Sequence, residues 1–470
     1  MCMVICMILE GCYPYVRGGV SGWTDSYIKA MPQHSFVLWT IAASEKSRGL
    51  FKYKLPPNVI HVQEVFLDAA LKRQYTKSSM SKFTPVEVGH IQKLINAAEP
   101  DWEKLFHCFR KTSENPVSFL MSEQFLQMTK QLCINKLQNI AFAELFYCLR
   151  SMFLPLIYLM GQPIPKADIY HATATGFGGI LGAMGKWKHQ KPFILTEHGI
   201  YTREREEEIL RSKWVGPGFK DIWIGLFHML SQCAYSKADV VTSLFQRAKE
   251  TQIQLGCNPD KCIVVKNGVD FDKFASIPVK MPNGFIDIGA IVRIAPIKDI
   301  KTMIYSFAEL KHDYPRARLH ILGDTDDKEY YDECVALIAN LEVKDILLVG
   351  NTDVKAYLEK LDFTILTSIS EGQPLAVIES LAAGRPCVVT DVGSCRELVE
   401  GDKEDKIGAA GICIPPMHRA ALTSAMLKLC TSESIRNSMG VAGKRRIMTQ
   451  YTHDRMIHTY ESVYHAERRK

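Results

Sequence analysis

The chain has 470 residues, of which 47% are hydrophobic, 10% are aromatic and 23% are charged. This apolar content excludes a disordered chain, and 30 Gly and 21 Pro are too few for a collagen-like or low-complexity protein. The length predicts two or three domains, each with a core of its own. The net charge of +6 is a mild excess without a basic run, so we expect no nucleic-acid partner; a few cations for a small anionic ligand fit this charge equally well.

Cysteine usage indicates the cellular compartment. The 14 Cys are scattered from Cys2 to Cys430, mostly inside apolar runs, and none forms a C-x-x-C pair. Cys257 and Cys262 have no Cys or His partner at zinc-finger spacing. We therefore expect reduced, mostly buried thiols and a cytoplasmic protein.

Two apolar runs are candidates for membrane segments. The opening run Met1–Leu9 lacks a basic flank and ends in Glu10-Gly11, so it is predicted to be a first strand rather than a signal peptide. The run Ser151–Gly161 is too short to cross about 30 Å of hydrocarbon. We expect a core helix that is broken at Pro155; a docking surface for a membrane partner is the alternative.

In chain order, residues 1–265 alternate short β-rich runs with helical patterns, which predicts a domain with a parallel sheet. Strands are predicted at Val4–Leu9, Ile169–His171, Pro192–Thr196 and Val240–Thr242, with helices from about Ser21 and at Ile222–Cys233. Between them, residues 70–160 have apolar side chains near every 3.6 positions and are predicted to form a helical insertion.

A second series, over residues 283–445, predicts another doubly wound sheet, whose ligands lie outside the carboxyl ends of the strands. Strands are predicted at Ile288–Val292, Leu319–Leu322, Ile346–Val349, Phe363–Leu366, Cys387–Thr390 and Gly411–Ile414, and helices at Ile300–Leu310, Tyr330–Leu341, Ala356–Leu361 and after Pro374. Residues 266–282 are the predicted linker, and 446–470 a helix that returns to the first domain. The fold class is thus α/β, with two Rossmann-like doubly wound domains facing a central cleft.

The segment Ser368–Glu379 follows a predicted strand and opens a helix. Pro374 suits the first helical position, so the amides of Leu375 and the next residue are expected to point out of the helix N-terminus, which favours anions. Glu371 and Glu379 bracket this end. A carboxylate beside a phosphate is unfavourable unless it accepts hydrogen bonds from hydroxyl groups, so we expect both to face a sugar; two solvated carboxylates are the alternative.

Two cations, Arg293 and Lys298, stand five residues apart just past the strand Ile288–Val292. Arg can bind phosphate through two parallel hydrogen bonds, and Lys adds a compact charge. Facing a helix N-terminus, the two would form a clamp for a diphosphate; two solvated loop cations are the alternative.

Together these residues resemble family 4 of the retaining GT-B glycosyltransferases, in which two such cations precede an E-x7-E pair. The turn Lys266–Asp270 resembles the inter-domain turn of that group. A narrower resemblance is to the PelF family, the cytosolic glycosyltransferases of Pel-type exopolysaccharide synthesis. It rests on Leu9–Gly11, Tyr13–Ser21, Thr196–Arg205 and Pro296–Lys301. The sequence departs from that pattern at Gly22, where Ser is usual, and in having almost nothing before the first strand.

The resemblance implies roles in donor binding for residues of both domains. Arg293 and Lys298 would neutralise the donor diphosphate, and Glu379 would hold the ribose hydroxyls. The donor sugar and its phosphate would be held by Glu371 and by the backbone of Gly372, Gln373, Pro374 and Leu375. Gly18 and Gly19 would let the first domain, on the acceptor side, approach the diphosphate, since a Gly pair permits close approach and positive φ.

His198 follows a predicted strand, and the resemblance implies that it contacts the transferred sugar; a satisfied core histidine is the alternative. The implied catalytic set is thus His198, Arg293, Lys298 and Glu371. Arg203 and Arg205 lie in a dense charge run, and the sequence leaves their role open.

Asp324–Asp327 contains the D-x-D pattern with which many transferases hold a metal. Because it directly precedes a predicted helix, we expect helix capping instead. The two cations and the helix end already supply positive charge to the leaving group. We therefore expect no metal and no cofactor, and retention through a front-face, oxocarbenium-like path.

Three rival functions compete with this one. An NAD-dependent dehydrogenase needs G-x-G-x-x-G after a strand, and Gly176–Gly179 lacks the third Gly at that spacing. A sugar-nucleotide-binding scaffold of a membrane complex and a sugar-nucleotide epimerase of the same fold stay open.

The expected donor is a UDP-sugar, by resemblance, with Asn351 and Val354 near the base. The expected acceptor is a polysaccharide, and membrane-bound synthesis subunits are further partners if the protein is peripheral at the inner face of the membrane. The sequence names neither the sugar nor the acceptor.

Overall fold

The computed structural model describes residues 2–72, 83–111, 116–402 and 405–469, and the chain divides into two compact units. The first unit consists of Met1–Ser243, Lys249–Ile263 and Glu461–Lys470, and the second of Leu244–Ala248 and Val264–Tyr460. Each unit has its own sheet and its own apolar core. The predicted linker, residues 266–282, is part of the second unit, because Val269, Phe274 and Ile277 are buried in its core.

The first unit is built on a sheet with the strand order β3-β2-β1-β4-β5-β6-β7. Its strands are β1 (Val4–Glu10), β2 (Ser35–Ala42), β3 (Val59–Phe66), β4 (Ile169–Ala172), β5 (Phe193–Glu197), β6 (Val240–Ser243) and β7 (Cys262–Val264). From β3 through β6 every neighbouring pair is parallel. The central strands β1, β4 and β5 are buried on both faces, which explains their continuous apolar runs. β2, β3 and β7 lie outside the strands predicted above.

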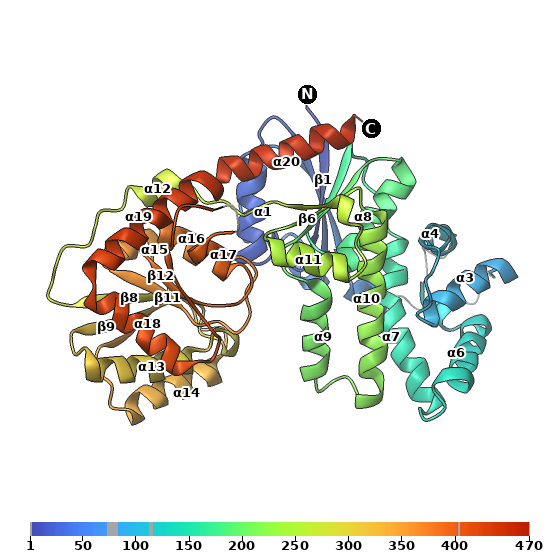
Figure 1. The fold of residues 1–470 in the computed structure, drawn as a ribbon. Helices are drawn as coiled ribbons and strands as arrows, with labels where there is room; N and C mark the ends of the chain where they lie inside the picture. The colour runs from blue at the N-terminus through green and yellow to red at the C-terminus, as the bar shows by residue number, and fades with distance from the viewer. Residues whose placement is uncertain (1, 73–82, 112–115, 403–404, 470) are drawn as a thin grey trace. The chain divides into compact units, whose positions relative to one another are not determined.

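Helices flank this sheet, and α8 packs both on its central strands and on α10 (Figure 1). They are α1 (Gly19–Lys29), α8 (Gly176–His189), α9 (Tyr201–Arg211), α10 (Lys220–Lys237) and α11 (Gln246–Gln254). The parallel strands joined by helices confirm the predicted Rossmann-like class for this unit.

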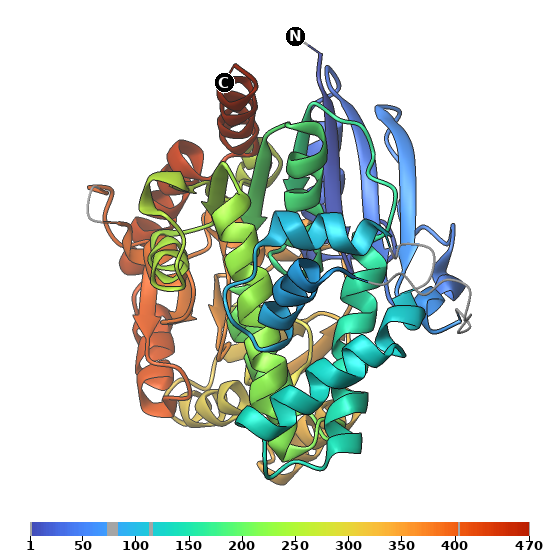
Figure 2. The ribbon, with the colours of Figure 1, turned by 90° about the vertical axis from the view of Figure 1, so that its right-hand side faces the viewer.

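The predicted insertion is helical and lies on one side of the first unit (Figure 2). Its helices are α2 (Asp68–Leu71), α3 (Pro85–Ile95), α4 (Trp102–Lys111), α5 (Pro116–Leu120), α6 (Glu123–Lys136) and α7 (Phe142–Met160). The break predicted at Pro155 is wrong, since α7 runs through it. Proline removes the hydrogen bond to the carbonyl four residues earlier and crowds that carbonyl with its ring; the residue there, Ser151, is exposed, so water can satisfy the displaced carbonyl.

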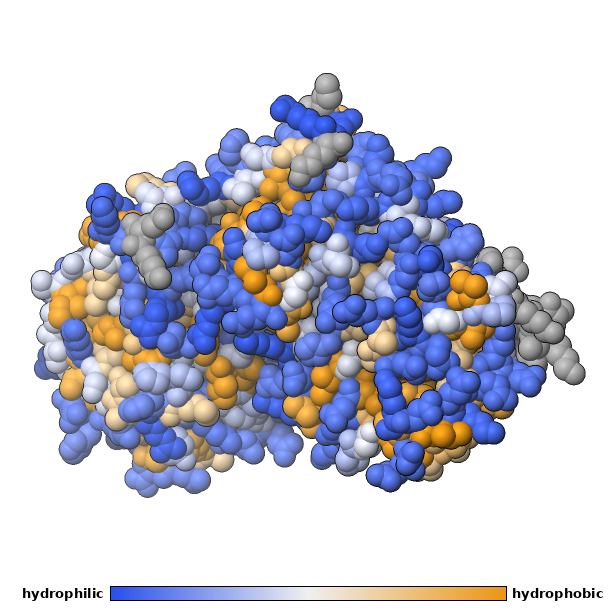
Figure 3. All heavy atoms as spheres, turned by 45° about the vertical axis from the view of Figure 1, so that its right-hand side comes forward, coloured by the Kyte–Doolittle hydropathy of each residue, from blue (hydrophilic) through white to orange (hydrophobic). Residues whose placement is uncertain are grey.

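Among the described residues, α7 is the helix that is long and apolar enough to span a membrane, and half of its apolar stretch is buried inside the first unit. Leu145, Leu149 and Leu156 belong to the core of that unit. Figure 3 shows further apolar side chains gathered over the insertion, toward the lower right of the view. Exposed apolar residues of the insertion include Leu126, Ile134, Phe142 and Tyr147. Packing in the core therefore accounts for much of the apolar character of α7.

The second unit has the strand order β10-β9-β8-β11-β12-β13, with every neighbouring pair parallel. Its strands are β8 (Ile286–Ile291), β9 (Ala317–Leu322), β10 (Ile346–Gly350), β11 (Phe363–Leu366), β12 (Cys387–Thr390) and β13 (Gly411–Ile414). Its helices are α12 (Phe271–Ala275), α13 (Ile300–Asp313), α14 (Lys328–Asn340), α15 (Val354–Leu358), α16 (Leu375–Ala382), α17 (Cys395–Glu400), α18 (Arg419–Thr431) and α19 (Glu433–Gln450).

This strand order fixes where a ligand can enter the second unit. From β8 the chain moves outward to β9 and β10, then returns to the other side of β8 and moves outward again through β11, β12 and β13. The order thus reverses between β8 and β11, and the loops after these two strands diverge there. Such a point at the carboxyl ends of the strands is where open α/β sheets bind ligands.

The last helix, α20 (His453–Arg468), begins in the second unit, and its residues from Glu461 onward belong to the first. There the Tyr27 hydroxyl donates to the Tyr464 hydroxyl at 2.5 Å, and Tyr464 lies 2.5 Å from Nδ1 of His171. All three side chains are buried. A polar network inside the first unit therefore holds the end of the chain.

Candidate functional site

The loop after β8 contains both predicted cations. Arg293 is exposed, whereas Lys298 ends a short 3₁₀ turn and its side chain is largely buried. Asp299 follows with a φ of 48° and caps α13 by accepting a hydrogen bond from the Thr302 amide at 3.3 Å. The loop thus ends in a sharp turn directly before α13.

Hydrogen bonds tie this loop to the loop after β11. The amide of Ile369 donates to the carbonyl of Ile297 at 2.9 Å, and the Thr367 hydroxyl donates to the carbonyl of Lys298 at 2.8 Å. These partners lie far apart in sequence but close in space, because β8 and β11 are neighbours in the sheet. The switch point therefore brings Lys298 and Glu371 together.

Glu371 forms the centre of a compact polar cluster. Its Oε1 accepts from Nζ of Lys298 at 2.5 Å and from the Ser368 hydroxyl at 2.5 Å. The side chains of Lys298 and Glu371 are 16% and 11% exposed, so the two opposite charges meet with little solvent screening. The sequence prediction assigns one to a diphosphate and the other to a sugar. The structure shows a direct ion pair, which the sequence did not reveal.

The helix α16 begins beside this cluster, and the side chain of its cap residue forms no hydrogen bond to the first amides of the helix. The placement predicted for Pro374 is wrong by one position. Its ψ of 111° is extended, so it is the cap residue, and its carbonyl accepts from the amides of Val377 and Ile378. The first amides of a helix have no acceptor inside the helix, and Leu375 and Ala376 are both partly exposed. Their N–H groups and the helix dipole are thus available to an anion.

Glu379 lies in the second turn of α16 and is largely buried. Burial raises the pKa of its carboxyl group to about 7, and the charge of Lys273 offsets only part of that rise. Hydroxyl groups that donate to a carboxylate favour its ionised form. Glu379 is therefore suited to receive the hydroxyls of a ligand, in keeping with its predicted role.

The aspartates of residues 324–327 bond to protein groups. Asp327 caps α14 by accepting from the Tyr330 amide at 3.0 Å, which confirms the predicted capping. Asp326 forms an ion pair with Arg293, and Asp324 accepts from the side-chain amide of Asn351 at 3.1 Å. In the described part of the chain, no group of three or more His, Cys, Asp or Glu side chains is placed to hold a metal ion.

Asn351 and Val354, predicted near a nucleotide base, lie at the carboxyl end of the edge strand β10. Asn351 is exposed, and Val354 opens α15 after the cap residue Asp353. Asn351, Val354 and Arg293 all follow the carboxyl ends of their strands, and these ends lie on one side of the sheet because all its strands are parallel.

Gln373 has a structural side chain. Its Oε1 accepts from the Asn267 amide at 2.7 Å, and its Nε2 donates to the Leu244 carbonyl at 3.3 Å. Only its backbone can therefore serve the donor role predicted for it. The neighbouring Gly372 carbonyl accepts from the Ser394 amide at 2.9 Å, so the loop is held from a second side.

In the first unit, Gly18 and Gly19 precede and open α1, with φ values of 88° and 48°. Both are exposed, and a Cβ at either would meet no heavy atom within 4 Å. The predicted positive φ is confirmed, and the backbone here is open to the close approach of another group.

His198 follows β5, and its ring packs edge-on against Trp23 with the ring centroids 4.6 Å apart. Burial lowers the pKa of this imidazole to about 4, so it is neutral at physiological pH. Its Nε2 is buried and has no hydrogen-bond partner among the described residues. The alternative considered above, a satisfied core histidine, requires a partner for this nitrogen, and the described residues supply none. Such an unpaired nitrogen is suited to a ligand hydroxyl.

The charge run of α9 divides into exposed and packed members. Arg203 is exposed, whereas Arg205 forms an ion pair with Glu208 at 2.5 Å and lies over the ring of Tyr201.

Glu10, at the end of β1, accepts from the Gly178 amide at 2.9 Å, and burial raises the pKa of its carboxyl group. The motif Leu9–Gly11 contains Glu10, but the sequence predicts no role for this residue. The one sequence feature that could have singled out Glu10 is its position at the end of a strand.

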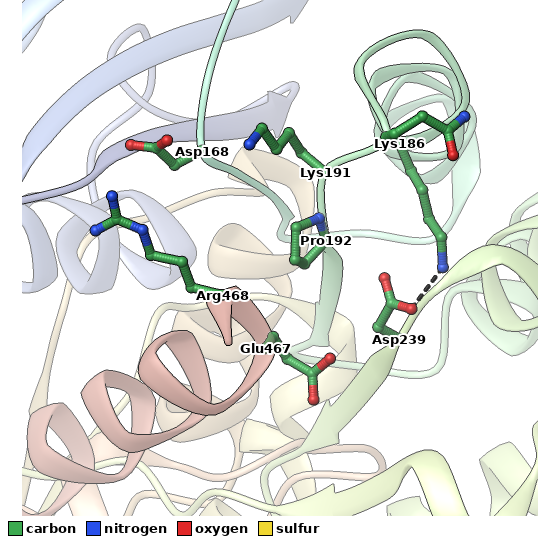
Figure 4. Close-up of a pocket in the computed structure, with 8 residues that line it drawn as sticks. Asp168, Lys186, Lys191, Pro192, Asp239, Glu467 and Arg468 are labelled. Atoms are coloured by element: carbon green, nitrogen blue, oxygen red, sulfur yellow. Dashed lines mark hydrogen bonds and ion pairs between the residues drawn. The ribbon is translucent and has the colours of Figure 1, made fainter. Parts of the chain in front are cut away.

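A separate pocket of about 300 Å³ lies near the amino ends of β4, β5 and β6 of the first sheet, whereas His198 follows the carboxyl end of β5 (Figure 4). It is lined by Asp168, Lys186, Pro192, Asp239 and Arg468 among others. Figure 4 shows Lys186 reaching toward Asp239, with which it forms an ion pair at 2.5 Å. None of the residues predicted for the site lines this pocket.

Comparison with known families assigns both parts of the chain. Residues 3–260 match the family described as "Domain of unknown function (DUF3492)", and residues 285–432 match the family described as "Glycosyl transferases group 1". The first match spans more than half of the 470 residues. The chain belongs to the DUF3492 family. The glycosyl transferases group 1 domain lies within the second unit and contains every residue of the switch-point loops described above.

Individual relatives are distant from this DUF3492 protein. It is 23% identical over 265 residues to the MMP alpha-(1->4)-mannosyltransferase of Mycolicibacterium hassiacum, a match that covers 56% of this chain and 62% of that one. It is 22% identical over 308 residues to the capsular polysaccharide biosynthesis glycosyltransferase CapM of Staphylococcus aureus, covering 63% and 76%. The chain spans less than two thirds of the length of the first curated relatives that it matches.

Among solved structures, Alr3699/HepE of Anabaena in complex with UDP is similar, with a TM-score of 0.62 and 13% identity over 98% of this chain and 99% of that one. At this identity the likeness shows the fold alone. The fold is therefore that of the GT-B glycosyltransferases, as predicted. The group 1 domain and the names of the relatives support a glycosyltransferase.

Proposed function

We propose that the protein is a retaining, metal-independent glycosyltransferase that moves a sugar from a UDP-sugar donor to a growing exopolysaccharide at the cytoplasmic face of the membrane, as PelF-type enzymes do. The observation that supports this most strongly is the arrangement at the switch point of the second unit. There the uncapped start of α16 lies beside the Lys298–Glu371 pair, with Glu379 in the next turn. Backbone amides that can donate hydrogen bonds to an anion and carboxylates that can accept hydrogen bonds from hydroxyls thus lie within one loop and one short helix.

The leaving diphosphate is the anion for which this arrangement is suited. When the bond between the anomeric carbon and oxygen breaks, negative charge develops on the diphosphate and positive charge on the sugar. The amides of Leu375 and Ala376 and the guanidinium of Arg293 can stabilise the diphosphate, at a few kcal/mol for each well-placed donor. Arg293 is exposed in its pair with Asp326, so exchanging that partner for a phosphate costs little.

The two carboxylates fit the neutral, hydroxyl-bearing parts of the same donor. Glu379 can accept hydrogen bonds from ribose hydroxyls, which would favour its ionised form. Glu371, held by Lys298 and Ser368, keeps its second oxygen for a hydroxyl of the donor sugar. For His198 of the first unit, the role of contacting the transferred sugar rests on the resemblance, and its buried Nε2, which has no partner among the described residues, suits a hydroxyl group.

The contacts of the D-x-D segment support the proposed metal independence. Asp326 is paired with Arg293, Asp327 caps a helix, and Asp324 accepts from Asn351. A metal held there would have to displace three protein contacts to supply charge that the cation and the helix end already provide. We therefore assign leaving-group stabilisation to protein groups alone.

The identity of the donor and acceptor rests on relatives and on the PelF resemblance. The Anabaena protein of similar fold was solved with UDP, and the Staphylococcus aureus relative is named for capsular polysaccharide biosynthesis. Retention of anomeric configuration follows from the resemblance to family 4. The exposed apolar residues of the insertion offer a surface for membrane-bound synthesis subunits.

The test is a panel of UDP-sugars incubated with the full chain and with oligosaccharide acceptors, with UDP release and product configuration measured. We expect UDP release from one of the UDP-sugars that requires the acceptor and keeps its rate in EDTA. NMR should show that the product has the same anomeric configuration as the donor. A strict Mg²⁺ requirement would overturn the metal-independent mechanism, and an inverted product would overturn retention. Interconversion of UDP-sugars without transfer would identify the epimerase alternative, and binding without turnover the scaffold.

A further inference from the structure

The second unit has another pocket, which we call the rear pocket, of about 670 Å³. Its lining includes Ile286 at the start of β8, Asp362 just before β11, and Pro386 just before β12. Because all strands of this sheet are parallel, the rear pocket lies at their amino ends, on the edge opposite to the switch-point loops. It shares no residue with the site described above.

The rear pocket has a marked excess of positive charge. Five cationic side chains line it, against the two carboxylates Asp362 and Glu433. The five are Lys280, Arg316, Arg385, Arg436 and Lys444. Asp362 is already engaged, because it accepts from Lys280 at 2.5 Å and from the Asp287 amide at 2.7 Å. Five cations against two carboxylates give the lining a net charge of +3, and one of these carboxylates, Asp362, is already paired with Lys280.

Four of these cations form no ion pair within the described part of the chain. Arg385 is buried, and its guanidinium donates only to carbonyls, those of Leu358, Ala383 and Pro278. Lys444 donates to the Ala275 carbonyl at 3.1 Å, and Arg436 to two carbonyls at the end of α18. Arg316 is exposed and lines the pocket with no hydrogen bond from its guanidinium in the described residues.

Two of the cations also repel each other. Burial lowers the pKa of Lys444, and the charge of Arg385 lowers it further. Such a shift means that the charged form of Lys444 is disfavoured as the protein stands. An anion placed between the two groups would remove this penalty, and phosphate, with its double charge and several acceptor oxygens, suits a mixture of Arg and Lys donors.

The rest of the lining suits an organic group attached to such an anion. Phe285 and Tyr314 present aromatic surface, and the exposed Val441 adds an aliphatic side chain. The volume lies within the range of about 300–1,000 Å³ that small-molecule sites occupy. An inorganic ion alone would leave most of this space unfilled.

We propose that the rear pocket binds a phosphorylated small molecule, whose phosphate is held by the unpaired cations of its lining and whose organic part lies against the aromatic side chains. The site is separate from the proposed donor site and does not depend on the proposed function. A ligand there would contact α19 and the segments that precede β8, β11 and β12.

The test is equilibrium dialysis of the full chain with radiolabelled inorganic phosphate, with a hexose monophosphate as competitor. We expect saturable binding with a dissociation constant near or below about 1 mM, weakened at least about tenfold by Lys444→Met and by Arg316→Gln. Arg316 is exposed, so its variant is expected to fold as the wild type does. Arg445→Met, which removes an exposed charge next in sequence and outside the pocket lining, should leave binding within about twofold.

Binding must also persist in Lys298→Met, which alters the donor site. Loss of phosphate binding in Lys298→Met would overturn the proposal, because the label would then report the donor site. Wild-type binding in both Lys444→Met and Arg316→Gln would overturn it too, as would the absence of saturable binding. Failure of the hexose monophosphate to displace the label would exclude a phosphorylated small molecule as the ligand.

Discussion

Two glutamates of the switch-point segment, eight residues apart, differ in their hydrogen-bond partners. Glu371 accepts hydrogen bonds from the ammonium of Lys298 and from the Ser368 hydroxyl. Glu379 is largely buried, the charge of Lys273 compensates only part of that burial, and the pKa of its carboxyl group is raised to about 7. A donor whose hydroxyls reach Glu379 would supply the hydrogen bonds that the folded protein does not.

The raised pKa of Glu379 makes stability depend on pH. Between about pH 4.5, the ordinary value, and pH 7, the folded protein keeps a proton that the unfolded chain has lost, so the free energy of unfolding falls as pH rises. Glu379→Gln has no such proton. The variant should match the wild type near pH 4.5 and exceed its stability by roughly 3 kcal/mol above pH 7, measured by urea unfolding. Parallel pH profiles for the two proteins would show that Glu379 does not titrate in this way.

The Lys298–Glu371 pair should show strong coupling. Either single variant, Lys298→Met or Glu371→Gln, leaves one charge largely buried without its partner, which costs roughly 2–4 kcal/mol. The double variant should cost less than the sum of the two. Urea unfolding of all four proteins gives the coupling energy. The exposed pair of Lys328 and Asp332 is the control, and its cycle should give less than about 0.5 kcal/mol; equal coupling energies in both cycles would contradict the account.

At the scale of elements, the loop between β12 and α17 supports the loop that contains Glu371. Gly393 has a φ of 53°, and a Cβ added there would stand 2.2 Å from the carbonyl oxygen of Gly372 and 2.3 Å from that of Glu371. Only glycine allows this close approach of two backbones. The position of Glu371 thus depends on a residue more than twenty positions away in sequence.

Gly393→Ala should therefore disturb donor binding as well as stability. The left-handed φ alone costs an alanine roughly 1–2 kcal/mol, and the contact with the two carbonyls should add about 1 kcal/mol or more. Gly49→Ala is the matched control, because Gly49 has a similar φ of 67° but a Cβ added there would meet no heavy atom within 4 Å. Urea unfolding and UDP titration compare the two variants. Similar losses of UDP affinity in both would mean that the close approach does not position Glu371.

The predictable part of the fold is the part that local sequence determines. β1, β12 and β13 can be placed within a residue because short apolar runs stand between turn residues. The sequence prediction lacks β2, although its residues are mostly apolar. It also lacks β3, a partly exposed strand of mixed polarity, and β7, which has only three residues; both give a weak pattern. Motif spacing indicates the site residues but not their partners. The bonds of Gln373 to Asn267 and Leu244 join segments that only the tertiary fold brings together.

At the scale of the whole molecule, the end of the chain is part of the first unit's structure. Tyr464 bonds to Tyr27 and His171, and all three are buried. Tyr464→Phe removes both bonds and leaves their partners without this hydroxyl, which should cost about 1–3 kcal/mol. Tyr147→Phe, at an exposed tyrosine, should change stability by less than about 0.5 kcal/mol.

Hydrogen exchange of the amides of α20 should also be faster in Tyr464→Phe than in the wild type, since the network holds the end of this helix. Wild-type exchange and a wild-type urea midpoint would together show that the network does not secure the chain end.

The central claim is that the switch-point loops of the second unit bind the diphosphate of a nucleotide sugar. Calorimetric titration of the full chain with UDP and with uridine tests it most directly, because the two ligands differ only in the diphosphate. We predict that UDP binds at least about a hundredfold more tightly than uridine, about 2.7 kcal/mol, and that Arg293→Ala and Lys298→Met each reduce this ratio at least about tenfold. Equal affinities for UDP and uridine, or a ratio unchanged in both variants, would contradict the account.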